Sequence, residues 1–252
     1  MMTLSVIIIT HNESGNIHDC LQSVSFADEC IVLDGGSTDE TAEIASSLHA
    51  KVITSPNWQG FGHQKNLALT HAQHDWVLSI DADERITPEL ATEIQEAIRQ
   101  DRFDVFDLPR RTNFCGAWIN HSGWTPDKVA RLFRRGQAQF SPDKVHERLV
   151  GPGFKRLGHL KHAMLHFSYP TPAHYWKKMQ TYSQAWAEQQ HLNGRQASMW
   201  RAFGAGSFAF FKSYIFRLGF LDGAMGLVVC TMQAQAAFGK YFTLYHLNQS
   251  KK

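Results

Sequence analysis

The sequence lacks the features that mark several protein classes. Its four cysteines form no Cys-x-x-Cys pair and no zinc spacing, so we expect reduced thiols in a cytoplasmic protein rather than disulfides. No basic leader precedes the first apolar run, which is too short for a signal peptide, and we therefore expect no export. The longest uncharged run, 223–239, has 17 residues, fewer than the roughly 20 that a spanning helix needs.

Acidic residues are scarce in the C-terminal part. From Arg195 onward there are seven basic residues and one acid, Asp222, whereas residues 1–194 hold 18 basic and 22 acidic ones. Aromatic residues between 200 and 245 alternate with lysine and arginine, which predicts helices lying on an anionic cytoplasmic membrane surface. Alternatively, these helices form a core or a dimer interface. The acidic body and the absence of a recognition motif argue against nucleic-acid binding.

Strand and helix patterns alternate through the first hundred residues. The apolar, β-branched run Leu4–Thr10 is typical of a central parallel strand. Thr87 followed by Pro88 predicts the start of an amphipathic helix reaching about Arg99. Further strands are expected over 30–33, 51–53 and 76–80, with helices over 17–24, 37–48 and 63–71. This alternation predicts an α/β fold with a doubly wound, mainly parallel sheet.

The pattern changes after residue 101. Short strand candidates at 105–108, 129–133, 148–150 and 160–167 are separated by turns rich in Gly, Pro and Asp, which predicts a mixed or antiparallel extension of the sheet. A helix is expected over 173–192, with Asn193-Gly194 as its C-cap. We therefore expect a catalytic domain over 1–170, with a nucleotide-binding half (1–100) and an acceptor half (101–170), and a helical region over 171–252.

Two carboxylates follow the strand at 76–80. Asp81 and Asp83 would point the same way if the backbone stays extended, with Ala82 pointing away. Paired carboxylates suit a hard cation such as Mg²⁺ or Mn²⁺, which in turn would hold a diphosphate. Alternatively, the two acids form a solvated strand end.

Other polar groups are expected at the same edge of the sheet. Asn12 with Glu13, Asp34, and Asp81 with Asp83 each follow a predicted parallel strand, so their segments should converge on one crevice. Asp34 could accept a hydrogen bond from a base or a ribose, or it could be a turn or capping residue. Ser37 and Glu40, within the same loop, have the spacing of a capping box.

These motifs carry a family resemblance. Thr10-His11-Asn12-Glu13, Asp34-Gly35-Gly36-Ser37-Thr38-Asp39-Glu40-Thr41 and Asp81-Ala82-Asp83 together resemble the GT-A fold of the family 2 inverting glycosyltransferases. The more specific similarity is to the bacterial enzymes that add glucose, in a β-1,4 linkage, to the inner-core heptose of lipopolysaccharide. It is carried by Lys144-Val145-His146-Glu147-Arg148, His166-Phe167-Ser168-Tyr169 and Phe220-Leu221-Asp222-Gly223.

The resemblance implies a nucleotide-sugar donor, UDP-glucose, and a divalent metal. It implies the following nucleotide-sugar contacts: Thr10, Asn12 and Glu13 at the nucleotide, Asp34 at the uracil or ribose, Asp81 at the ribose, and Asp83 at the metal-bound diphosphate. It also implies a lipopolysaccharide acceptor, which would place the enzyme on the inner face of the bacterial inner membrane.

Three residues of the second half are candidates with open alternatives. Glu147 is the candidate general base, or a surface glutamate paired with Arg148; unlike the usual family acid, it follows a histidine and is not part of a Glu-Asp pair. Arg131 could reach the diphosphate, and it should face away from Lys128, three positions earlier on the same strand. His166 could complete the metal site or be a core histidine.

Other functions remain to be weighed. Processive family members carry a Gln-x-x-Arg-Trp signature, whereas residues 196–200 read Gln-Ala-Ser-Met-Trp, which favours addition of a single sugar. A nucleotidyltransferase would need a basic loop early in the chain, and residues 11–16 contain no Lys or Arg. A non-catalytic module that binds nucleotide sugars would keep Asp34 and Asp83 without needing Glu147.

Overall fold

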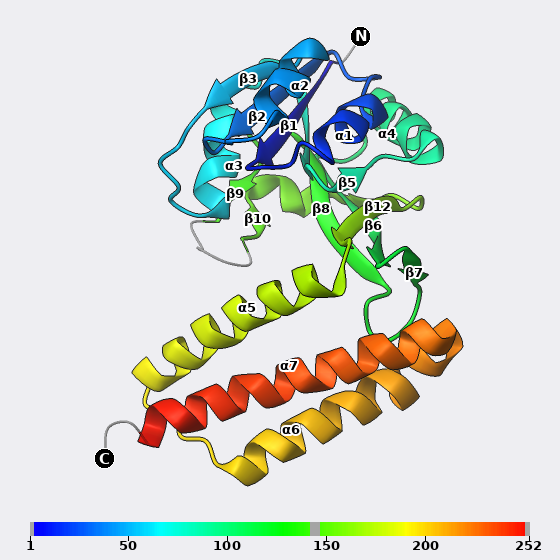
Figure 1. The fold of residues 1–252 in the computed structure, drawn as a ribbon. Coiled ribbons are helices and arrows are strands. Elements are labelled where there is room, and N and C mark those ends of the chain that lie inside the picture. The colour runs from blue at the N-terminus through cyan, green and yellow to red at the C-terminus, as the bar shows by residue number, and fades with distance from the viewer. Residues whose placement is uncertain (1–2, 142–146, 250–252) are drawn as a thin grey trace. The chain divides into compact units, whose positions relative to one another are not determined.

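The computed structural model describes residues 3–141 and 147–249, so the Lys144–His146 part of the motif before Glu147 lies outside the described residues. The chain divides into two units. Unit 1 comprises residues 1–110 and 127–166, and unit 2 comprises residues 111–126 and 167–252. Figure 1 shows the elements of each unit.

Unit 1 begins with alternating strands and helices. They are β1 (Leu4–Thr10), α1 (Ile17–Ser23), β2 (Glu29–Asp34), α2 (Thr41–Ser47), β3 (Lys51–Thr54), α3 (Phe61–Thr70), β4 (Trp76–Asp81), β5 (Glu84–Arg85) and α4 (Pro88–Gln100). The first four strands lie in the order β3-β2-β1-β4, and each neighbouring pair is parallel. The predicted parallel sheet is confirmed.

The sheet continues through antiparallel strands. The later elements are β6 (Val105–Phe114), β8 (Asp127–Arg134), β9 (Gln139–Phe140), β10 (Leu149–Val150), the 3-10 helix η1 (Pro152–Arg156), β11 (Leu157–His159) and β12 (Met164–Tyr169). Strand β8 pairs antiparallel with β4 and with β6, and β12 pairs antiparallel with β5. The predicted mixed extension is therefore confirmed, although β12 begins four residues later than expected.

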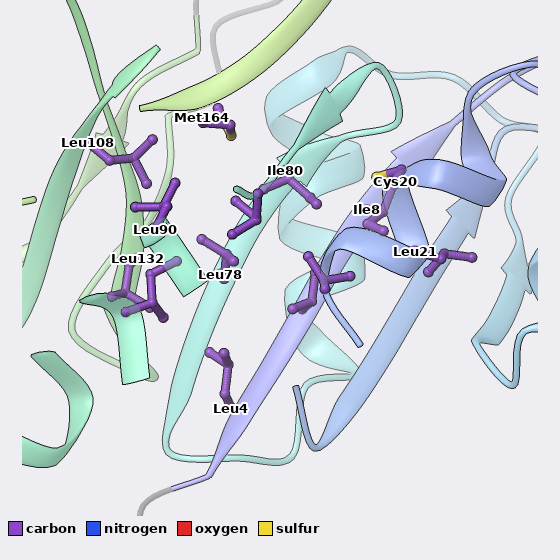
Figure 2. Close-up of a cluster of buried hydrophobic side chains, with 14 of the residues drawn as sticks. Leu4, Ile8, Cys20, Leu21, Leu78, Ile80, Leu90, Leu108, Leu132 and Met164 are labelled. Carbon is purple, nitrogen blue, oxygen red and sulfur yellow. The ribbon is translucent and has the colours of Figure 1, made fainter. Parts of the chain in front are cut away.

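Apolar side chains on the two faces of the sheet form separate cores. On one face of the sheet, Leu4 and Ile8 of β1 pack with residues of α1, α2 and α4; Figure 2 labels both side chains within this cluster. On the other face, Ile7 and Ile9 pack with α3 and with strands β9 and β10. This alternation follows from the two-residue period of a strand. Because both faces are covered, β1 is buried along its whole length, and each fully buried Leu or Ile contributes about 1.5–3 kcal/mol.

Local signals set some helix ends and failed at others. Thr87 caps α4 as predicted, since its side chain accepts a hydrogen bond from the Leu90 amide. The predicted capping box of Ser37 and Glu40 was wrong, because α2 begins at Thr41 and the side chain of Glu40, its N-cap residue, forms no capping hydrogen bond. Ser37 bonds to Asp34 instead.

Unit 2 is mainly helical. Its elements beyond the end of β6 are β7 (Ala117–Ile119), α5 (Pro172–Leu192), α6 (Met199–Phe211), the π-helical turn η2 (Lys212–Phe216), the 3-10 helix η3 (Gly219–Asp222) and α7 (Gly223–Gln249). Helix α7 packs against α5 and α6. As predicted, α5 ends at Leu192 with Asn193 as its C-cap, and Gly194 has a positive φ of 74°.

A tight bend joins α6 and α7. The Asp222 carboxylate accepts hydrogen bonds from the amides of Asn120 and His121, at 3.0 and 2.9 Å, and from the side chains of His121 and Ser122. A Cβ atom at position 226 would lie 1.9 Å from the Gly219 carbonyl oxygen, so only glycine fits there. None of the described helices is long and apolar enough to cross a membrane by itself. Taken together, the segments 199–216 and 219–249, which are bent by 72° relative to each other, have the length and composition that a membrane span requires.

Candidate active site at the carboxyl ends of the sheet

The ends of three adjacent strands bring the predicted acids to one edge. In the parallel register Asp34 of β2 lies opposite Thr10 of β1, and Asp81 of β4 lies opposite Ile9. Neighbouring strands are about 4.8 Å apart, so the two carboxylates start from backbones on either side of β1. The strand ends that carry these acids therefore lie at one edge of the sheet.

The loop after β2 is held by its own side chains. Asp34 is almost fully buried, and its carboxylate accepts from the amides of Gly36 and Ser37, at 3.1 and 2.9 Å, and from the Ser37 hydroxyl. Asn12 has a positive φ of 56°. Its side-chain Oδ1 accepts a hydrogen bond from the Thr38 backbone amide at 2.8 Å, and its backbone amide donates to the Ser37 hydroxyl. The β1 and β2 loops are therefore tied together before any ligand arrives.

Asp81 lies between two cations. Its Oδ1 is 3.0 Å from Lys65 Nζ and its Oδ2 is 2.8 Å from a terminal nitrogen of Arg131. Burial opposes ionisation, but the charges of Arg131 and Lys65 outweigh it and hold the pKa of Asp81 well below its usual range. Arg131 is buried whereas Lys128 is exposed, and a register shift in the pairing of β8 with β6 at Arg131 interrupts the regular alternation on which the predicted opposite orientation depends.

Glu84 is a second, fully buried acid in this cluster. Its Oε2 accepts from the Asp81 amide at 2.9 Å, and its Oε1 lies 3.2 Å from both Arg131 and Arg110. Arg110 is also paired with Asp127 at 2.8 Å. Burial disfavours the charged Arg131, but Asp81 and Glu84 raise the pKa of that guanidinium above its usual value. The cluster is an alternating chain of acids and cations in which each buried charge has a partner.

Close packing against α3 positions Glu147. A Cβ atom at Gly62 would lie 2.1 Å from the Ser141 carbonyl oxygen, and the Asn66 side chain forms two hydrogen bonds with the Phe140 backbone, of 2.8 and 2.9 Å. Glu147 Oε1 then lies 2.8 Å from Lys65 Nζ. Lys65 is nearly buried and touches both Glu147 and Asp81, so one lysine joins the candidate base to the end of β4.

The side chains of Asp83 and Asp81 do not point in the same direction. The strand ends at Asp81 and a turn follows, so the extended backbone assumed for the two acids is absent. Asp83 Oδ2 lies 3.2 Å from His166 Nε2 instead, because β5 and β12 place His166 opposite Glu84. Asp81 and Asp83 therefore serve different partners.

The pair of Asp83 and His166 fits a divalent cation that shares its ligands with a substrate. Within residues 3–141 and 147–249 no group of three or more His, Cys, Asp or Glu side chains is arranged around a metal. Mg²⁺ is often held by one or two carboxylates together with phosphate oxygens and water, and carboxylate oxygen also suits Mn²⁺. His166 Nδ1 is buried with no hydrogen-bond partner among the described residues, so the ring is held by its Nε2 side.

Other predicted residues lie at the same edge, and some site residues escaped prediction. The Glu13 carboxylate accepts from Asn16 at 2.8 Å, and the Thr10 carbonyl accepts from Gly35. Lys65, Glu84 and Arg110 were missed; the one local signal for Glu84 was its place as a third acid directly after Asp81-Ala82-Asp83. A cavity of about 900 Å³ lies beside Leu4 and Asp28, at the amino ends of the strands, and is lined by none of the predicted residues.

Comparison with known proteins identifies the family. The family model described as Glycosyl transferase family 2 matches residues 5–156, a span that includes the β1, β2 and β4 ends and Glu147. The chain belongs to glycosyl transferase family 2. The predicted GT-A fold class is confirmed with it.

Relatives of this glycosyltransferase extend over nearly its whole length. An uncharacterized glycosyltransferase of Rickettsia bellii (strain RML369-C) is 32% identical, over 97% of this chain and 87% of that protein. A protein of Rhizobium meliloti (strain 1021) named lipopolysaccharide core biosynthesis glycosyltransferase LpsC is 27% identical, over 95% of this chain and 93% of that one. Among solved structures, S. aureus TarS is 20% identical with a TM-score of 0.49, covering 72% of this chain and 39% of that chain.

Proposed function

We propose that this glycosyltransferase moves a single glucose from UDP-glucose to the inner-core heptose of lipopolysaccharide, with inversion at the anomeric carbon. Family membership supports sugar transfer, and the relative named LpsC supports the acceptor. The observation that carries the proposal is the link through Lys65, because it joins the carboxylate of Glu147 to the strand end that bears Asp81.

The donor would occupy the edge formed by β1, β2 and β4. Thr10, Asn12 and Glu13 would border the nucleotide, Asp34 would accept from the uracil or ribose, and Asp81 would accept from the ribose. Residues 1–100 then serve the donor and residues 101–170 the acceptor. Arg131 is engaged with Asp81 and Glu84, so we propose that it acts on the donor mainly by fixing Asp81.

The reaction would be a single displacement. Glu147 takes the proton of the acceptor hydroxyl as its oxygen forms a bond to the anomeric carbon. The bond from that carbon to the diphosphate oxygen breaks, and its electron pair leaves with the nucleoside diphosphate. Attack from the face opposite the leaving group inverts the configuration.

A divalent cation, Mg²⁺ or Mn²⁺, would be held by Asp83 and His166. When bound, it would neutralise the charge of the diphosphate. The short contact between these two side chains supports the assignment.

We expect Asp83→Asn and His166→Ala each to weaken Mn²⁺ binding by about tenfold or more, measured by electron paramagnetic resonance with UDP present. His162→Ala is the control, since His162 is half-exposed and bonded to Glu93. Equal Mn²⁺ affinity in all four proteins would contradict the assignment.

The acceptor is a lipid, so we propose that the enzyme works on the inner face of the bacterial inner membrane, attached through residues 171–252. The basic excess after Arg195 supports this location, because the cytoplasmic leaflet is anionic.

Glu147→Gln tests the catalytic proposal. With UDP-glucose, Mg²⁺ and truncated lipopolysaccharide, we expect turnover to fall by about 10²–10⁴-fold, with UDP binding retained in calorimetry. Glu96→Gln, on the exposed side of α4, should match the wild type. Full turnover in Glu147→Gln would reject the base assignment. UDP-sugar binding by the wild type without transfer to any acceptor would favour the non-catalytic binding module.

A further inference from the structure

Helix α6 and the turn η2 present large apolar side chains to the outside. Trp200 is 85% exposed and Phe216 is 76% exposed. The exposed set, called the apolar stripe below, consists of Trp200, Phe203, Phe208, Phe211, Ile215 and Phe216. From Trp200 to Ile215 these positions recur at intervals of three to five residues and lie along one side of the helix, and Phe216 follows directly. At about 1.5 Å per residue the apolar stripe is about 24 Å long.

The opposite side of α6 carries small residues. Ala202, Gly206 and Ser213 are buried, and a Cβ atom at Gly206 would lie 3.2 Å from both the Ala234 carbonyl oxygen and Phe238 Cβ of α7. The amphipathic helix of a protein in water places its large apolar residues inward. Here the polarity is reversed: small residues make the close helix contact, as in membrane proteins, and the aromatic residues face outward.

The charges around the apolar stripe are positive. Arg201 and Lys212 are exposed, and at about 100° per residue both fall along one border of the apolar stripe. Asp222 is the one acid after Arg195, and its side chain is 3% exposed and turned into the bend. The outer surface of α6 therefore combines apolar area with cations that no neighbouring acid of this segment neutralises.

We propose that the apolar stripe is the membrane-contacting surface of this enzyme and lies in the interfacial layer of an anionic bilayer, with Arg201 and Lys212 at the lipid phosphates. Tryptophan and phenylalanine favour this depth, and basic side chains at the border extend to the headgroups. The positive charge selects lipid over a second copy of the chain, whose own α6 would bring like charges together. The inference deepens the proposed location and rests on it, but not on the proposed chemistry.

Flotation with phosphatidylglycerol and phosphatidylethanolamine vesicles, without donor or acceptor, tests the surface. We expect the full chain to bind, and Phe208→Asp/Phe211→Asp to bind at least about tenfold less. Leu192→Asp, which changes an even more exposed apolar residue at the end of α5, should bind within twofold of the wild type. Lys212→Gln should lose about fivefold on these vesicles and little on phosphatidylcholine.

Circular dichroism and retained UDP binding would show that each variant is folded. Equal vesicle binding by the wild type and Phe208→Asp/Phe211→Asp would overturn the proposal, as would failure of the wild type to bind anionic vesicles. A wild-type dimer in ultracentrifugation that this double variant abolishes, without vesicle binding, would also overturn it and assign the apolar stripe to self-association. Because no sugar substrate is present, these outcomes are independent of whether Glu147→Gln abolishes transfer.

Discussion

Replacing Lys65 by methionine should destabilise unit 1. Methionine fills a similar volume but removes the charge that lies 3.0 Å from Asp81 and 2.8 Å from Glu147. Loss of one partner of a buried ion pair costs about 3–5 kcal/mol. Asp81 keeps Arg131 at 2.8 Å and its side chain is 30% exposed, so we expect the lower end, about 3 kcal/mol. For a chain of this size that lowers Tm by about 6–12 °C.

Urea unfolding followed by circular dichroism measures this loss, with Lys51→Met as the matched control. Lys51 is an exposed residue at the start of β3, so its variant should stay within about 0.5 kcal/mol of the wild type. A double-mutant cycle of Lys65→Met with Glu147→Gln should give a coupling energy of about 1 kcal/mol or more. Equal stability of the two lysine variants would refute the view that Lys65 joins the acids.

Two further predictions concern Asp81 and Asp222. Because the pKa of Asp81 is lowered on folding, its stabilising effect is complete above the unfolded-state value and is lost as pH falls through the folded-state value. The stability gap between wild type and Asp81→Asn should therefore be constant from about pH 5 to pH 8 and shrink below about pH 4; a gap that closes above pH 5 in urea titrations would contradict this. Asp222→Ala leaves the amides of Asn120 and His121 without their acceptor. It should lower the free energy of unfolding by about 2–4 kcal/mol and speed hydrogen exchange at residues 120–122, measured by mass spectrometry. Asp222→Asn, which keeps an acceptor oxygen, should lose less, and unchanged exchange in both variants would be evidence against the carboxylate as the clamp.

The parts of the fold that local sequence determines were predictable. The β-branched run of β1 and the Thr87-Pro88 start of α4 depend on neighbours in the chain, and both predictions are confirmed. The start of α2 was missed because Ser37 bonds to Asp34 and to the Asn12 amide rather than capping the helix. Tertiary hydrogen bonds outweighed the capping signal at that position.

The site divides in the same way. The position of Asp34 and Asp81 at one edge of the sheet follows from two parallel strands that end in acids, which a sequence displays. The Lys65 to Glu147 pair joins residues 82 positions apart, and no periodic pattern reports such a pairing. The turn after Asp81 also depends on a distant contact. Glu84 accepts a hydrogen bond from the Asp81 amide, and its carboxylate is in turn paired with Arg131.

The carboxylate of Asp34 has little bonding capacity to spare. It offers about four lone-pair positions, and the loop amides of Gly36 and Ser37 and the Ser37 hydroxyl take three of them. If Asp34 receives the base, one acceptor position is left for it. Uracil presents one ring N–H and would fill that position, whereas guanine presents two adjacent donors and would have to displace a bond that holds the loop. Discrimination between uridine and guanosine nucleotide donors would thus follow from hydrogen bonds that the protein makes to itself.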